Sequence, residues 1–135
     1  YSAELFTDME TLLQTSDFIS LHLPLNENTH GILGYDEIHN IKVGATLINT
    51  ARGGLVDEPA LISALQSGHL RGAGLDVFAE EPLADGHPLL SLDNVILSPH
   101  VAYNTPDAVK AIFEITVRNI CRYFDGEPIN IVAAP

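Results

Sequence analysis

Residues 45–65 read ATLINTARGGLVDEPALISAL. The first five of them, 45–49, are largely apolar and partly β-branched, which is typical of a short buried strand. Asp57 is a good helix N-cap, Pro59 is tolerated in the first helical turn, and Gly68 lies beyond the last helical position. The stretch therefore predicts a strand, a loop with two glycines and then a helix.

Three further segments have the character of the strand at 45–49. They are short and largely apolar, and they lie at residues 17–21, 72–77 and 94–98. Because apolar residues are nearly continuous in these segments, we expect the strands to be buried on both faces of a sheet.

Helical patterns lie between the strands and after the last one. Asp8 is a candidate N-cap for a first helix, and a second, short helix is indicated near Tyr35. The start of the final helix is marked most clearly, with Thr105 as N-cap and a proline at the first helical position, and Gly126 ends it. The apolar positions of this helix are Val109, Ile112, Phe113, Ile120 and Phe124.

The alternation of strands and helices with short connections predicts an α/β fold with a parallel, Rossmann-like sheet. We assign residues 1–126 to this domain and interpret residues 127–135 as a tail that leaves it for another domain. In such sheets ligands bind beyond the carboxyl ends of the strands. The residues that follow each strand are therefore candidates for function.

The composition argues against several classes of partner. The 135 residues include 18 Asp and Glu against 6 Lys and Arg, a formal net charge of −12. This charge would repel nucleic acid or an anionic membrane surface, because binding to phosphates depends on Lys and Arg. No apolar run approaches the ~20 residues that cross a bilayer, no secretory signal is visible, and the single cysteine, Cys121, fits a reducing compartment. We interpret the acidity mainly as a source of solubility, and we expect a soluble, cytoplasmic protein.

Arg52 follows the strand at 45–49 and precedes two glycines. Its planar guanidinium matches the geometry of a carboxylate, and the glycines allow the backbone to approach a ligand without a Cβ in the way. An exposed arginine in a turn is the alternative. The position after a strand and the two glycines favour a ligand-binding role.

His100 and Glu81 form a second candidate group. Pro99 restricts the backbone before His100, and an imidazole suits proton transfer near neutral pH. A structural histidine is the alternative. If Glu81 pairs with His100, its carboxylate would orient the ring and favour the catalytic interpretation. The neighbouring Glu80 is interpreted as solvated.

Asp76 ends an otherwise apolar strand, where a carboxylate without a partner would be costly. Two partners are considered for it. One is a donor on a ligand, such as a carboxamide, and the other is an ordinary backbone N–H.

Three other patterns are set aside. Residues 72–74 read GAG, but these glycines precede a strand, whereas a phosphate-binding loop follows a strand and opens a helix. A hydrolase triad of Ser98, His100 and Asp76 is rejected because the sequence has no Gly-x-Ser-x-Gly motif. No metal site is predicted, because the remaining histidines lack the spacing of metal ligands. We interpret them as surface residues: His30, His39, His69 and His87.

Four segments, in matching order and spacing, resemble the D-isomer-specific 2-hydroxyacid dehydrogenase family. They are SDFISLHLP at 16–24, NTARGGLVDE at 49–58, GLDVFAEEP at 74–82 and NVILSPH at 94–100. The resemblance spans residues 9–132. It implies that the chain is the carboxyl-terminal part of a dinucleotide-binding domain that uses NAD or NADP.

The resemblance also implies roles for individual residues. Arg52 would bind the carboxylate and carbonyl of the substrate, His100 would be the acid and base, and Glu81 would hold His100. The substrate would be a 2-oxo acid or a D-2-hydroxy acid, and we expect the parent protein to be a homodimer. Asp76 would meet the nicotinamide carboxamide. The full set of expected cofactor contacts is Leu23, Pro24, Thr29, Thr50, Ala51, Arg52, Asp76 and His100.

The family's Gly-x-Gly-x-x-Gly loop does not occur in the 135 residues. We therefore expect a fragment of a longer protein that is inactive by itself, because the pyrophosphate of the cofactor would lack its helix amino terminus. Two alternatives are a stand-alone interaction module of Rossmann-like shape, in which the residues at the strand ends are remnants, and a corepressor-like dinucleotide sensor of the same family. Such sensors tend to have a tryptophan soon after the histidine, where this chain has Tyr103 and no tryptophan.

Overall fold

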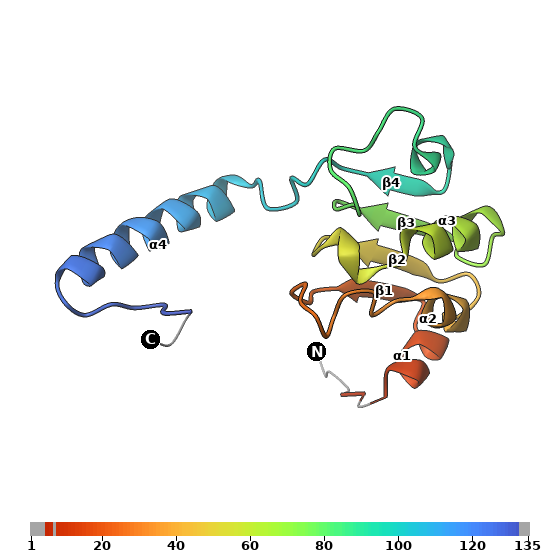
Figure 1. Cartoon of the computed structure of the whole chain (residues 1–135), viewed down its shortest axis with the longest axis horizontal. Helices are drawn as coiled ribbons and strands as arrows, with labels where there is room; N and C mark the ends of the chain where they lie inside the picture. The colour runs from red at the N-terminus through yellow and green to blue at the C-terminus, as the bar shows by residue number, and fades with distance from the viewer. Residues whose placement is uncertain (1–4, 7, 133–135) are drawn as a thin grey trace. The chain divides into compact units, whose positions relative to one another are not determined.

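The computed structural model describes residues 5, 6 and 8–132. In this part of the chain four parallel strands form one sheet in the order β1-β2-β3-β4, and their arrowheads in Figure 1 point the same way. The strands are β1 (Phe18–Leu21), β2 (Thr46–Asn49), β3 (Gly72–Leu75) and β4 (Val95–Leu97). The predicted α/β fold with a parallel sheet is confirmed.

Helices alternate with these strands, as the sequence pattern predicts. The described α-helices are α1 (Met9–Thr15), α2 (Tyr35–Asn40), α3 (Glu58–Gln66) and α4 (Pro106–Phe124). Two short 3₁₀ helices, which the sequence pattern did not indicate, are η1 (Gly53–Leu55) and η2 (Pro88–Ser91).

Local hydrogen bonds explain where the helices begin and end. The side chains of Asp8, Asp57 and Thr105 accept backbone N–H groups in the first turns of α1, α3 and α4. Beyond the ends of α3 and α4, Gly68 and Gly126 have φ angles of 76° and 78°, a region that favours glycine. The predicted caps and stops are therefore confirmed.

The chain divides into two compact units, residues 1–100 and residues 101–135. The first unit holds the sheet and helices α1 to α3. The second holds α4, which has no buried residue. The predicted domain boundary at residue 126, which separates the domain from the tail of residues 127–135, is not tested by this division and stays a prediction.

One face of the sheet carries the hydrophobic core. Alternate strand residues on that face, such as Ile19, Leu47 and Ala73, are aligned by the strand register and are buried in one cluster with side chains of α1, α2 and α3. On the other face Phe18 and Ile96 are 65% and 78% exposed. The prediction of strands buried on both faces is therefore wrong for the described residues.

The strand order explains this one-sided burial. When parallel strands are added in one direction, right-handed crossovers place each connecting segment on the same face of the sheet. Helices cover both faces where the strand order reverses, and the order β1-β2-β3-β4 contains no reversal. The composition of one strand does not show which strands lie beside it. The sequence pattern therefore could not distinguish burial on one face of the sheet from burial on both faces.

Within the described residues, none of the helices combines the length and the apolar character that a membrane span requires. Because all four strands are parallel, the segments that follow them leave the sheet at the same edge. This carboxyl edge holds the candidate site.

Candidate functional site at the carboxyl edge of the sheet

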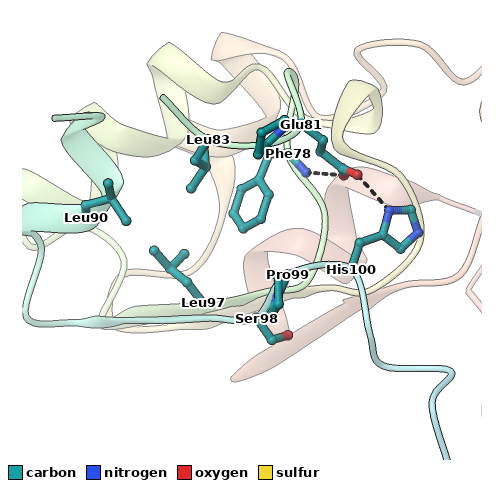
Figure 2. A pocket seen from close by; sticks show the side chains of 9 residues that line it. Phe78, Glu81, Leu83, Leu90, Leu97, Ser98, Pro99 and His100 are labelled. Carbon is teal, nitrogen blue, oxygen red and sulfur yellow. Dashed lines mark hydrogen bonds and ion pairs between the residues drawn. The ribbon is translucent and has the colours of Figure 1, made fainter. Parts of the chain in front are cut away.

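The side chains of His100 and Glu81 are in direct contact. His100 Nδ1 and Glu81 Oε2 lie 2.8 Å apart, and the two side chains are 42% and 36% exposed. Figure 2 shows the imidazole turned toward the carboxylate, which reaches it from the loop after β3. This pairing was expected from the family resemblance, and it uses Nδ1 of the ring and not Nε2.

The backbone of His100 is held in an uncommon conformation. Its φ is 56°, in the left-handed region that residues other than glycine adopt infrequently. The preceding turn is closed by a hydrogen bond from the N–H of His100 to the carbonyl of Ser98, at 3.1 Å. Backbone strain of this kind often occurs where a side chain must be aimed for function.

Glu81 accepts two hydrogen bonds as a carboxylate. Besides the contact with His100, its Oε1 accepts the backbone N–H of Phe78 at 3.0 Å. The hydrogen bond from His100, followed by the one from Phe78, holds the pKa of Glu81 below its ordinary value. Glu81 is therefore favoured in its ionised form, which is the form that orients an imidazole.

Exchange of His100 for alanine should raise the pKa of Glu81 toward its ordinary value, because the largest cause of the lowering is removed. The carbon-13 chemical shift of the Glu81 carboxyl, followed by NMR as a function of pH, measures this change. His39→Ala, an exposed histidine on α2, is the control and should leave the titration of Glu81 unchanged.

The same shift has a consequence for stability. Because the pKa of Glu81 is lower in the folded protein, ionised Glu81 stabilises the fold above its ordinary pKa, and this contribution is lost as the pH falls through the lowered value. The His100→Ala variant should therefore lose less stability in that acidic range than the wild type does. An equal acid-induced loss in both proteins would contradict the assignment.

The loop with Arg52 is fixed by a buried asparagine. Asn49 is 2% exposed, and its side chain donates to the carbonyl of Arg52 at 2.9 Å and accepts the N–H of Ala51 at 3.1 Å. The guanidinium of Arg52 is exposed and donates through Nη1 to the carbonyl of Ala51 at 2.6 Å. The backbone at Arg52 is thus rigid while its charged group faces outward, as a ligand-binding role requires.

Gly53 explains why a glycine follows Arg52. A Cβ at this position would lie 1.9 Å from the carbonyl oxygen of Phe78 and 2.7 Å from the nitrogen of Ala79. No side chain fits there without moving the backbone. The loop that carries Arg52 is therefore packed directly against the turn that precedes Glu81.

Five of the residues expected to contact the cofactor line one cavity of about 570 Å³ beyond β1 and β2. These five are Leu23, Pro24, Thr50, Ala51 and Arg52. The other three expected residues, Thr29, Asp76 and His100, are not in the lining. The hydroxyl of Thr29 instead donates to the carbonyl of Pro24 at 2.6 Å and accepts the N–H of Asn26 at 2.9 Å, so it shapes the loop that forms the cavity wall.

Asp76 is 3% exposed at the end of β3. Its Oδ1 accepts the hydroxyl proton of Ser98, at 2.5 Å. This contact comes from the neighbouring strand end and was not among the two partners considered from the sequence. It also agrees with the rejection of a hydrolase triad, since the hydroxyl of Ser98 donates to Asp76 and not to His100.

Glu81 and His100 line a second cavity, of about 490 Å³. Figure 2 shows that its wall is largely apolar, with Phe78, Leu83 and Leu97 around the space. Arg52 and His100 therefore lie at the same edge of the sheet but line different cavities. They follow β2 and β4, which are two strand spacings apart, or about 10 Å.

Two of the histidines that were interpreted as surface residues are partly buried. The side chain of His87 is 20% exposed and bonds to Glu58, and Nε2 of His69 is buried without a hydrogen-bond partner among the described residues. His30 and His39 are exposed. Glu58 lies 29 residues from His87, so no local pattern signals that contact. Over residues 5, 6 and 8–132, no three His, Cys, Asp or Glu side chains gather as a metal site would require.

Comparison with known proteins agrees with this geometry. Residues 1–102 match the family described as D-isomer specific 2-hydroxyacid dehydrogenase, NAD binding domain. A glyoxylate reductase of Thermofilum pendens is 45% identical over 122 residues, which cover 90% of this chain and 36% of that protein.

Solved structures are similar as well. An acyclic imino acid reductase in complex with NADPH and D-Arg is 37% identical with a TM-score of 0.88, covering 94% of this chain and 40% of its own. D-lactate dehydrogenase with NAD⁺ from Lactobacillus jensenii is 35% identical with a TM-score of 0.85, covering 96% of this chain and 43% of its own.

The chain spans 36% of the length of the glyoxylate reductase and no more than 43% of either structural relative. The match to the family nevertheless covers most of the chain and includes Arg52, Glu81 and His100. The predicted nicotinamide cofactor agrees with the description of the family as NAD-binding. The chain therefore belongs to the NAD-binding domain family of the D-isomer specific 2-hydroxyacid dehydrogenases.

Proposed function

We propose that the protein containing this chain transfers a hydride between NAD or NADP and a 2-oxo acid or D-2-hydroxy acid. The observation that carries the proposal is the contact of His100 with Glu81 at the same sheet edge as Arg52. A histidine held by a carboxylate, and an arginine whose loop backbone is fixed by Asn49, are the groups that reduction of a 2-oxo acid needs.

The carboxyl edge fits a dinucleotide. The cavity beyond β1 and β2 combines apolar side chains of Leu23 and Pro24 with the polar groups of Thr50 and Arg52, as expected for a ring-and-phosphate ligand at the carboxyl ends of parallel strands. Asp76 is buried at the next strand end, and we propose that it meets the carboxamide of the nicotinamide, as the family resemblance implies. When bound, the nicotinamide supplies or accepts the hydride.

In the proposed reaction the protein's own residues bind the substrate and move the proton. Arg52 pairs with the substrate carboxylate through its planar fork and polarises the adjoining carbonyl. His100 donates a proton from Nε2 to the carbonyl oxygen during reduction and accepts it back during oxidation. Glu81 holds Nδ1 and stabilises the charged ring during the transfer.

Other properties of the parent protein are part of the proposal. We propose a cytoplasmic homodimer that acts on small molecules, with no nucleic-acid or membrane partner, consistent with the formal net charge of −12. Both NAD and NADP are proposed as cofactors, because the residues that discriminate between them follow a Gly-x-Gly-x-x-Gly loop, which does not occur in the 135 residues.

The proposal is tested by assaying the complete encoded protein and the 135-residue chain side by side. NADH and NADPH are each supplied with glyoxylate and with hydroxypyruvate. We expect turnover by the complete protein and little or none by the 135-residue chain, because the latter lacks the helix amino terminus that binds pyrophosphate. Binding of NADH by the complete protein without reduction of any 2-oxo acid would instead favour the corepressor-like sensor.

A further inference from the structure

Glu58 and His87 form a second carboxylate–histidine pair, for which the proposed reaction has no direct use. Glu58 Oε1 and His87 Nε2 lie 3.1 Å apart, and the side chains are 17% and 20% exposed. Glu58 is the first residue of α3, and His87 is the N-cap of η2. The pair therefore joins two elements that are far apart in the sequence.

The second ring nitrogen of His87 fixes the direction of this hydrogen bond. Nδ1 accepts the backbone N–H of Leu89, at 3.3 Å. Because an accepting nitrogen carries no proton, the proton of the neutral ring is on Nε2 and is donated to Glu58. His87 thus caps η2 with one nitrogen and anchors it to α3 with the other.

The other oxygen of Glu58 holds the opposite end of the same loop. Its Oε2 accepts the backbone N–H of Ala79 at 3.3 Å, while Oε1 takes the proton of His87. Residues 79–87 are therefore fastened to one carboxylate at both ends. Glu81, the partner of His100, lies within this segment.

Glu58 also connects this loop to the chain segment that carries Arg52. Glu58 follows Arg52 closely in the sequence, and between them Gly53 packs against the carbonyl of Phe78 and the nitrogen of Ala79. The turn before Glu81 is thus in contact both with the backbone of Gly53 and with the side chain of Glu58. Movement of Glu58 would shift Glu81 relative to Arg52.

We propose that Glu58 and His87 are positioning residues, which fix the loop 79–87 so that Glu81 meets His100 at the sheet edge that also carries Arg52. The inference rests on the proposed function for its effect on turnover. The placement of Glu81 can also be measured without turnover, so failure of the inference and failure of the proposed function are distinguishable.

Two substitutions of His87 separate the anchoring of the loop from the capping of η2. His87→Asn keeps an oxygen that accepts the N–H of Leu89, but its side chain is too short to donate to Glu58. His87→Gln places an amide N–H near the position of Nε2 and retains that donor. Glu58→Gln replaces one of the two carboxylate oxygens, which accept from Ala79 and His87, with an amide nitrogen.

The kinetic test uses the complete protein with NADH and glyoxylate. We expect kcat to fall about tenfold or more in His87→Asn and in Glu58→Gln, as a small displacement of a catalytic group produces, with the KM for NADH unchanged. His87→Gln should recover most of the lost kcat. Glu80→Gln is the control, because Glu80 is an exposed carboxylate of the same loop with no hydrogen-bond partner in the described structure.

The second readout is the pKa of Glu81, measured by carbon-13 NMR. It should rise toward its ordinary value in His87→Asn and Glu58→Gln and stay low in His87→Gln, whether or not the protein turns over. Unchanged kcat together with an unchanged pKa of Glu81 in the first two variants would overturn the inference alone. Absence of turnover in the wild type would overturn the proposed function and leave the NMR result to decide the positioning role.

Discussion

The complete protein with His100 replaced by alanine is expected to reduce 2-oxo acids about 10²- to 10⁴-fold more slowly than the wild type. The reason is that the developing alkoxide then has no positioned proton donor, whereas the cavity beyond β1 and β2, where we place the cofactor, is lined by other residues. Steady-state kcat with glyoxylate and fluorescence titration with NADH measure the two effects separately.

The affinity for NADH should therefore change much less than kcat in this variant. His39→Ala, on the exposed surface of α2, serves as the control for loss of a histidine elsewhere and should retain wild-type turnover. If His100→Ala weakened NADH binding as much as it lowered kcat, His100 would act mainly in binding, and its assignment as the acid and base would be refuted.

Replacement of Arg52 is expected to have the next largest effect. Arg52→Ala removes the partner of the substrate carboxylate, and loss of one strong charge-assisted interaction of about 3 kcal/mol corresponds to a decrease of about 10²-fold in kcat/KM. Arg52→Lys keeps the charge but loses the planar fork, so it should restore only part of the activity. Initial rates over a range of glyoxylate concentrations give kcat/KM for each variant.

Arg71 provides a matched control for Arg52. It is an exposed arginine that directly precedes β3, and so it lies at the amino edge of the sheet, opposite to the candidate site. Arg71→Ala removes the same charge from the same fold and should leave kcat/KM for glyoxylate near the wild-type value. Equal losses in the Arg52 and Arg71 variants would mean that net charge, and not carboxylate recognition, accounts for the effect.

Local features of the fold could be predicted because their causes lie within a few residues. Asp57 caps α3 through the N–H of Ala60, three positions away, and Thr105 caps α4 through Ala108 in the same manner. The left-handed glycine after α4, Gly126, likewise follows from the chemistry of one position. Such signals depend on the chain itself and not on what packs against it.

Features that depend on distant partners could not be predicted in the same way. Burial of the strands on one face follows from the strand order, which the composition of Ile19 or Ile96 does not contain. Ser98 reaches Asp76 across 22 residues and His87 reaches Glu58 across 29. The sequence around a polar side chain does not indicate a partner that lies far away along the chain.

The candidate site lies between these two cases. Proximity of Arg52, Glu81 and His100 was expected because parallel strands end at one edge, while the pairing of Glu81 with His100 rested on the family resemblance. Asn49, which fixes the loop at Arg52 through two hydrogen bonds, was part of a quoted motif but received no role. Its burial at the last position of β2 is the feature that reveals its function as a support.

The proposed reaction requires that Arg52 and His100 act on one molecule. A crystal structure of the complete protein with NAD⁺ or NADP⁺ and oxamate tests this requirement directly. Oxamate presents a carboxylate beside a carbonyl, as a 2-oxo acid does. We predict that the guanidinium of Arg52 holds the carboxylate and that Nε2 of His100 lies within hydrogen-bond distance of the carbonyl oxygen, with Nδ1 still on Glu81. Oxamate bound without contact to Arg52, or with His100 turned away from its carbonyl, would contradict the account.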